Sequence, residues 1–354
     1  MTAGSVRYTV ATLCTAVLAL GSGESLAAQQ TERHTLRGNA VAIYNLVGEM
    51  RVEAGSGSDV LVEVTRAGRD AGRLRTQTGS RDGRETLSVV YPGDQIIYPR
   101  MGRSSRSQLR LRDDGTFGGS ERGGRQVTVS GGGSGIEAYA DLRVSVPAGR
   151  RIVVHQGVGK VWVSNVDGEL RVDASSASIE SEGTRGTLTI DVGSGSVQVR
   201  GAEGDVTVDS GSGSVQASQI RGSRLRLDTG SGSVTATDLT VDDLNVDVGS
   251  GRVRLSGVRA RNAVVDTGSG GVEIALTAPI RSLRIETGSG GVNLTVPENI
   301  GADVEIDTGS GGITVDLPAE ITRRSRNYFR GRIGDGSGSI RIDTGSGGVR
   351  VRRG

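Results

Sequence analysis

Beyond residue 150, short runs in which apolar and polar residues alternate return at a nearly constant interval. Residues 188–190 read Leu-Thr-Ile and residues 197–199 read Val-Gln-Val, and a further apolar residue, Ala202, follows them. Alternation with a period of two predicts strands that bury one face. Each unit therefore offers about five inward side chains, grouped as two, two and one.

One phrase, Asp-Thr-Gly-Ser-Gly-Ser/Gly-Val, marks each unit, and we call its first residue the anchor. The ten anchors, of which the first two begin degenerate copies, are His155, Asp173, Asp191, Asp209, Asp228, Asp247, Asp266, Glu286, Asp307 and Asp343. They are 18 to 21 residues apart, except for a last interval of 36. Since one unit cannot bury its own apolar face, the units must stack. The pattern predicts an all-β fold, a β-solenoid of the single-stranded β-helix type with about ten coils of 18–21 residues.

The corners between strands carry the glycines and the acidic anchors. Glycine suits a tight corner because it adopts positive φ without steric cost, and an aspartate beside a turn can accept hydrogen bonds from the turn amides. Stacking would align the anchors from Asp191 to Asp307 along one edge at intervals of about 5 Å. Calcium prefers oxygen-rich sites, which leaves cation binding open as the alternative to turn capping.

The repeat pattern divides the chain into unequal parts. Residues 29–150 contain strand-like runs without a repeat and are expected to form a β-rich cap with an Arg- and Gly-rich insertion at 92–125. Residues 151–354 form the expected solenoid, with an excursion at 316–339 that leaves the rod. The last strand, at 349–351, has little sequence after it to cover its edge, so a self-polymerising envelope scaffold is one alternative function.

Residues 1–28 have the features of a secretory signal peptide. Arg7 precedes an uncharged, mostly apolar run from 8 to 20, and small residues follow at the expected cleavage positions. The run is too short to span a bilayer, and we expect no transmembrane span in the mature chain. The only cysteine, Cys14, lies in this run, so cleavage leaves no thiol chemistry or disulfides. We expect the protein to be exported to the periplasm or the cell surface.

Composition argues against two classes of protein, nucleic-acid binders and disordered chains. The 42 basic and 40 acidic residues nearly cancel, and a nucleic-acid partner is not expected because such proteins usually show a basic excess. Regularly spaced aliphatic residues between the 58 glycines argue against disorder.

The residue types give no catalytic set, no cofactor site and no metal site. The two histidines, His34 and His155, are about 120 residues apart, and no Gly-x-Ser-x-Gly or phosphate-binding phrase occurs. We therefore expect His155 to be a solvent-facing turn residue. The chain is expected not to be an enzyme; the enzymatic alternative is a carbohydrate-active β-helix protein such as a polysaccharide lyase.

Two arginine-rich segments are the candidate binding regions. One spans 100–125, and the other, in the late excursion, combines arginines with two aromatic residues. The expected ligand contacts of the late segment are Arg323, Arg324, Arg326, Tyr328, Phe329 and Arg330. Guanidinium groups beside aromatic rings favour an envelope or surface partner such as an anionic polysaccharide or a protein.

The mature sequence resembles the bacterial putative-adhesin family of exported or membrane-attached domains of unknown function. The resemblance rests on residues 43–52, Ile-Tyr-Asn-Leu-Val-Gly-Glu-Met-Arg-Val, on the recurrent Thr-Gly-Ser-Gly-Gly-Val coils, and on the excursion before the final coil. It implies a non-enzymatic, adhesin-like structural or interaction module of the cell envelope. No catalytic residues accompany it.

Overall fold

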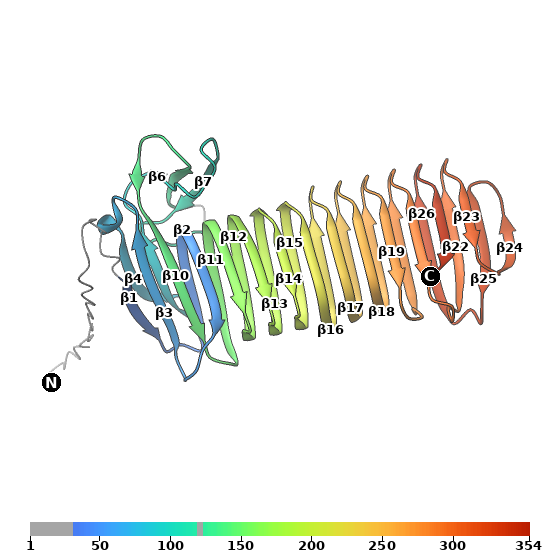
Figure 1. Cartoon of the computed structure of the whole chain (residues 1–354), viewed down its shortest axis with the longest axis horizontal. Helices are drawn as coiled ribbons and strands as arrows, with labels where there is room; N and C mark the ends of the chain where they lie inside the picture. The colour runs from blue at the N-terminus through green and yellow to red at the C-terminus, as the bar shows by residue number, and fades with distance from the viewer. Residues whose placement is uncertain (1–30, 119–122) are drawn as a thin grey trace, which may run out of the picture.

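The computed structural model describes residues 31–118 and 123–354. The expected signal peptide, residues 1–28, therefore lies outside the described residues. The described chain forms 27 strands and one short 3-10 turn, η1 (Ala71–Arg73). The strands make one sheet of 23 members and a separate sheet of four. Figure 1 shows a rod with a small lobe above its N-terminal end.

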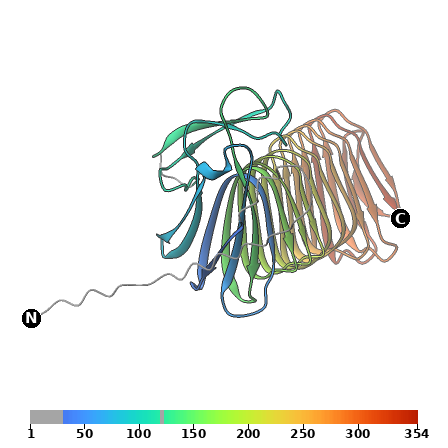
Figure 2. The same ribbon diagram turned by 60° about the vertical axis from the view of Figure 1, so that its left-hand side comes forward.

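The N-terminal strands surround the start of the rod. They are β1 (Thr31–Leu36), β2 (Ala40–Ala54), β3 (Val60–Ala67), β4 (Arg75–Arg81), β5 (Arg84–Val90), β6 (Gln95–Ile97), β7 (Arg106–Leu111), β8 (Arg125–Ser130), β9 (Ile136–Glu137) and β10 (Tyr139–Val146). Strands β6 to β9 form the lobe, in the order β7-β8-β6-β9, and Figure 2 shows it over the first coils. The segment 92–125 thus contains strands rather than a plain loop.

The rod itself is built from long strands that bend around the coil corners. They are β11 (Arg150–Ser164), β12 (Asp167–Glu182), β13 (Arg185–Ser194), β14 (Val197–Arg200), β15 (Glu203–Ser212), β16 (Val215–Thr229), β17 (Val234–Val248), β18 (Val253–Thr267), β19 (Val272–Leu276), β20 (Ser282–Thr287), β21 (Val292–Val296), β22 (Ala302–Thr308), β23 (Ile313–Asp316), β24 (Glu320–Arg324), β25 (Tyr328–Ile333), β26 (Gly338–Thr344) and β27 (Val349–Arg353). Parallel pairing joins successive coils. The predicted β-solenoid is confirmed.

The anchors align in one column along the rod. His155 pairs with Asp173, Asp173 with Asp191, and the register continues without a slip at each following anchor as far as Glu286. The alternating apolar residues point inward as the pattern predicts: Leu188 and Ile190 are 2% and 0% exposed. The core is therefore one continuous column of aliphatic side chains.

The first coil lies earlier in the sequence than the repeat indicated. β2 pairs in parallel with β11 from Ala40 to Glu53, so it is a coil of the solenoid rather than part of a separate cap. β5 and β10 pair with the two halves of its other edge, and the antiparallel strands β4, β3 and β1 lie outside them. The repeat phrase is missing in β2 because its corner carries the buried Asn45, whose Nδ2 donates to Ala140 O at 2.8 Å.

The last coil in the sequence is not the last coil of the rod. β26 pairs with β20 on one side and β22 on the other, and β27 lies between β21 and β23. Figure 1 marks the C-terminus short of the tip, where β24 is outermost. The expectation that strand 349–351 has an uncovered edge is therefore wrong, because the earlier coil of β22 and β23 covers it.

The hydrogen bonds at the corners come from threonine rather than from the anchor acid. Gly270 N donates to Thr267 Oγ1 at 3.1 Å, and Gly232 N donates to Thr229 Oγ1 at the same distance. This threonine directly follows the anchor, so it points into the core while the anchor carboxylate points outward. Among the described residues, no turn amide is bonded to an anchor from Asp191 to Asp343, so the predicted turn-capping by aspartate is wrong.

Candidate functional site

The C-terminal hairpin carries every residue of the candidate contact set. β24 and β25 pair antiparallel, and β25 also pairs antiparallel with β22, which attaches the hairpin to the outermost coil. The turn between the two strands is held by Ser325, whose N–H donates to Tyr328 O at 2.8 Å and whose Oγ accepts from Tyr328 N at 3.1 Å. The excursion is thus an extension of the sheet.

The two faces of the hairpin separate the candidate residues. Tyr328 and Arg330 alternate with Phe329 along β25, so they lie on the outer face, whereas Phe329 points into the core and is 1% exposed. Phe329 is therefore a buried structural residue opposite Ile306 of β22, and not a ligand contact. Tyr328 Oη donates to Glu305 Oε1 at 3.1 Å, and the Arg323 guanidinium carbon lies 5.1 Å from the centre of the Tyr328 ring.

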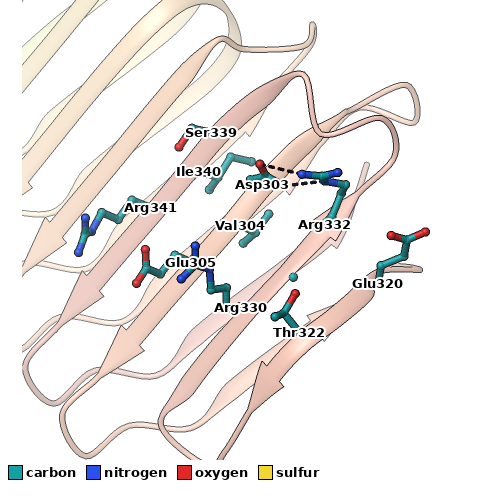
Figure 3. Close-up of a pocket in the computed structure, with 11 residues that line it drawn as sticks. Asp303, Val304, Glu305, Glu320, Thr322, Arg330, Arg332, Ser339, Ile340 and Arg341 are labelled. Carbon is teal, nitrogen blue, oxygen red and sulfur yellow. Dashed lines mark hydrogen bonds and ion pairs between the residues drawn. The ribbon is translucent and has the colours of Figure 1, made fainter.

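A groove of about 530 Å³ runs across the outer face between the hairpin and the last coils (Figure 3). Its charged lining consists of Asp303, Glu305, Glu320, Arg330, Arg332 and Arg341. Figure 3 shows the Arg332 side chain directed at Asp303, and its Nε and Nη2 donate to the two carboxylate oxygens at 2.8 and 3.3 Å. The hydrogen bond from Arg332 lowers the pKa of Asp303, so this carboxylate stays ionised and is a poor proton acceptor.

The remaining arginines of the hairpin have no such partner. Among the described residues, no carboxylate lies within 4 Å of Arg323, Arg324, Arg326 or Arg330. Some arginines along the middle of the rod do pair with an adjacent coil, as Arg254 does: its Nε lies 3.0 Å from Glu273 Oε2. The hairpin therefore gathers four arginines without a close ion pair at one end of the molecule, and one of them, Arg330, lies opposite Glu305 in the β22–β25 register.

The arginines of the other candidate segment, 100–125, are mostly used within the fold. Arg100 Nη1 lies 3.1 Å from both Glu49 Oε1 and Asp141 Oδ2, and Arg125 Nη1 lies 3.1 Å from Asp94 Oδ1. Arg122 lies outside the described residues. These contacts join the lobe and the first coil, so this segment is a weaker candidate for a ligand.

His155 lies in a largely buried aromatic cluster rather than at an exposed corner. Its ring stacks on Tyr44 with a centroid distance of 4.2 Å and an angle of 2°, and Phe117 meets both rings edge-on. Burial, aided by nearby arginines, lowers the pKa of His155 to about 4. The expected solvent-facing position was wrong because the lobe, which has no repeat to reveal it, covers this corner. His34 lies apart, on β1 beside Glu32.

The column of acidic anchors remains free of an obvious cation site. Burial raises the pKa of Asp209, and Asp228 and Asp191 raise it further through like-charge repulsion. Nowhere in residues 31–118 and 123–354 do three His, Cys, Asp or Glu side chains gather closely enough to hold a metal ion. In the same ranges, no helix is long and apolar enough to cross a membrane.

Fold and site together define a capped β-solenoid with a basic hairpin at one end. The model of the Toastrack DUF4097 family matches residues 131–352, and the chain belongs to this family of unknown function. No curated protein is significantly similar to it.

Two solved structures are similar to the chain, each at 12% identity and over 92% of its length. One is a putative cell adhesion protein from Clostridium sporogenes, covered over 100% of its own chain with a TM-score of 0.20. The other is a putative lipid binding protein from Parabacteroides distasonis, covered over 97% with a TM-score of 0.42.

Proposed function

We propose that this protein is an exported, non-catalytic interaction module of the bacterial cell envelope, and that its C-terminal hairpin binds an anionic partner. The observation that carries the proposal is the set of four hairpin arginines without a carboxylate within 4 Å, namely Arg323, Arg324, Arg326 and Arg330. The leader-like residues 1–28 support export to the periplasm or the cell surface.

The chemistry of the hairpin favours carboxylate or sulfate groups on a polysaccharide, or acidic side chains on a protein. A guanidinium group donates two parallel hydrogen bonds to one carboxylate, which gives both affinity and orientation. Arg323 is already held over the Tyr328 ring, so less side-chain entropy is lost when it binds. Arg330 projects into the open groove, where an extended polymer has room to lie.

The geometry supports a binding role over the lyase alternative. A lyase needs a base that can accept a proton beside groups that stabilise the developing charge. In the groove, Asp303 is held by Arg332 and Glu305 accepts a hydrogen bond from Tyr328. The neutral His155 is stacked in the aromatic cluster at the opposite end of the rod.

Binding to polygalacturonate, a polymer of carboxylate-bearing sugars, tests the proposal by isothermal titration calorimetry. Replacing the four unpaired arginines by alanine should weaken binding at least about tenfold, since each charged hydrogen bond contributes about 1.5–3 kcal/mol. The matched control removes four arginines that are ion-paired along the rod: Arg151, Arg185, Arg254 and Arg261.

The control should change affinity less than about threefold, because the net charge falls equally but the hairpin is intact. Neutral dextran should not bind. Equal loss in both variants would reduce the effect to general electrostatics and contradict a hairpin site. A pull-down from envelope extracts with the same variants then identifies the natural partner.

A further inference from the structure

The only tryptophan of the chain lies on the outer surface of the rod rather than in its core. Trp162 of β11 is partly exposed and alternates with the buried Val161 and Val163. The guanidinium carbon of Arg51 lies 4.5 Å from the centre of the indole ring, and Lys160 Nζ lies 5.5 Å from it. Arg51 approaches from β2 on one side of β11, and the coil of β12 lies on the other side. The two cations help to hold a large aromatic ring at the surface.

A hollow of about 140 Å³ adjoins this ring on the side of β12 and β14. Its long polar side chains are Glu180, Glu182, Gln198 and Arg200. Within residues 31–118 and 123–354, none of these four side chains has a hydrogen bond or an ion pair. Together they offer acceptors and donors, which suits a sugar because each hydroxyl group both donates and accepts. The C–H face of a pyranose ring can pack on the indole ring by dispersion.

The position of Trp162 recurs on each following coil. The side chains aligned with it, which we call the Trp162 row, are Trp162, Glu180, Gln198, Gln216, Thr235, Arg254, Glu273 and Asn293. Two further hollows, of about 520 and 370 Å³, adjoin the part of the row from Thr235 to Asn293. Since neighbouring strands are about 4.8 Å apart, the seven steps of the row span about 34 Å. Such a row of hollows has the shape to take an extended chain.

The charges that line the three hollows cancel. They comprise three acids and three arginines, namely Glu180, Glu182, Glu273, Arg200, Arg252 and Arg254. Arg254 is moreover paired with Glu273, at 3.0 Å. Most of the remaining lining consists of serine, threonine, amide and glycine residues. A polyanion would meet the acids at both ends of the row, so the electrostatics favour an uncharged partner rich in hydroxyl groups.

We propose that the Trp162 row binds an extended chain of uncharged β-1,4-linked pyranose sugars, one of which stacks on Trp162. Such chains are straight and stiff, so several sugars reach successive hollows with little loss of conformational entropy. Dextran, whose α-1,6 links make it flexible, loses more entropy on binding and is not expected to bind. The inference goes beyond the proposed function, because the anionic partner contacts the hairpin and not this face of the rod.

The fluorescence of the single tryptophan tests the site directly in the full chain. Titration with cellohexaose or chitohexaose, which differ in the substituent at C2 of each sugar, should change the emission of Trp162 and saturate. Saturation with either sugar supports the site, and the tighter of the two identifies the preferred substituent. Cellobiose should bind at least about tenfold more weakly than cellohexaose, because it forms fewer hydrogen bonds along the row. No saturable change with either hexaose would overturn the proposal.

Calorimetry with the tighter hexaose tests the named residues. Trp162→Ala should weaken binding at least about tenfold, because buried tryptophans dominate the energy of many interfaces. Gln198→Ala should weaken it about threefold or more, since one exposed amide is lost from the hollow. The matched control is Asn245→Ala, which removes an amide of β17 that aligns with Arg226 and Val264, outside the row. It should leave the affinity unchanged.

The Gln198→Ala variant keeps the test valid if Trp162→Ala fails to fold, because the Gln198 side chain has no partner within the described chain. Equal affinities of the Gln198→Ala and Asn245→Ala variants would contradict binding along the row. Replacing the four hairpin arginines by alanine should leave hexaose binding unchanged. A loss of hexaose binding in that variant would place the sugar on the hairpin and overturn this inference.

Discussion

At the scale of single residues, the threonine after the anchor connects neighbouring corners. Thr267 is fully buried; its Oγ1 accepts from Gly270 N at 3.1 Å and lies 3.4 Å from Gly251 O of the preceding coil, to which it donates. The hydroxyl thereby satisfies polar groups that the close stacking of corners removes from water. The equivalent position in the preceding coil is Val248, which has the same shape but no hydroxyl.

We expect Thr267→Val to lower the free energy of unfolding by about 1–2 kcal/mol, because the Gly270 amide loses its acceptor. Val248→Thr provides the matched control, since it adds a hydroxyl at the equivalent position of the preceding coil. There Gly251 follows three residues later, as Gly270 follows Thr267. It should leave stability unchanged or raise it. Urea unfolding of both variants measures the difference, and equal destabilisation would show that shape rather than hydrogen bonding matters here.

The His155 cluster gives a pH-dependent prediction. Its folded pKa of about 4 lies below the usual value of about 6.5. The neutral ring is the favoured folded form, so this contribution to stability is complete above about pH 6.5 and is lost as the pH falls through 4. His155→Phe keeps a ring against Tyr44 and should flatten the fall in melting temperature between pH 7 and 4. A titration midpoint near 6.5 by NMR would contradict this account.

At the scale of the elements, the corner glycines set how closely coils can stack. A Cβ on Gly270 would lie 1.7 Å from Gly251 O of the preceding coil, whereas a Cβ on Gly271 would meet nothing closer than 3.5 Å. The later corners therefore need glycine for close backbone approach rather than for positive φ. Positive φ does apply in earlier corners such as Gly213, with φ of 138°.

Gly270→Ala should lower the free energy of unfolding by more than about 2 kcal/mol, since the added methyl group forces two coils apart. Gly271→Ala, one residue further on, should change it by less than about 1 kcal/mol, because the space is open and alanine restricts the unfolded chain. Thermal melts followed by circular dichroism compare the two. A similar loss in both would refute the stacking argument.

The repeat predicted the coils but not their order. Period-two alternation around each anchor identified the inward residues, and the interval of 36 after Asp307 revealed the excursion. However, every coil has the same inward pattern, so the sequence cannot show that Asp343 lies between Glu286 and Asp307. The arginines of the hairpin were identified from composition, but the inward direction of Phe329 depends on pairing with β22, which is a long-range contact.

At the scale of the whole molecule, the anchors form a line of like charges along one edge. Burial and the acidic neighbours Asp247 and Glu286 raise the pKa of Asp266. Asp209 is affected in the same way. For such groups the contribution to stability is complete below the unfolded pKa of about 3.9 and is lost as the pH rises through the higher folded value. The rod therefore carries a charge penalty at neutral pH that salt should reduce.

Asp209→Asn should raise the denaturation midpoint at pH 7 and low salt, because one charge leaves the line. Asp303→Asn is the opposing control: its carboxylate is stabilised by Arg332, so its loss should lower the midpoint at the same pH. Both effects should shrink at 1 M salt, measured by urea unfolding. A lower midpoint for Asp209→Asn would contradict a charge penalty along the line of anchors.

β26 and β27 lie between two coils that come earlier in the sequence, and this position affects how the end of the rod folds. In a solenoid each coil contacts only its neighbours, so folding propagates from one coil to the next. Here β22 and β23 are synthesised before β26 and β27, the strands that separate them from β20 and β21. β22 and β23 therefore cannot pair stably with β20 and β21, because β26 and β27 must later insert between them. The last three coils therefore assemble as one unit, and β26 and β27 join the coil of β20 and β21 to the coil of β22 and β23.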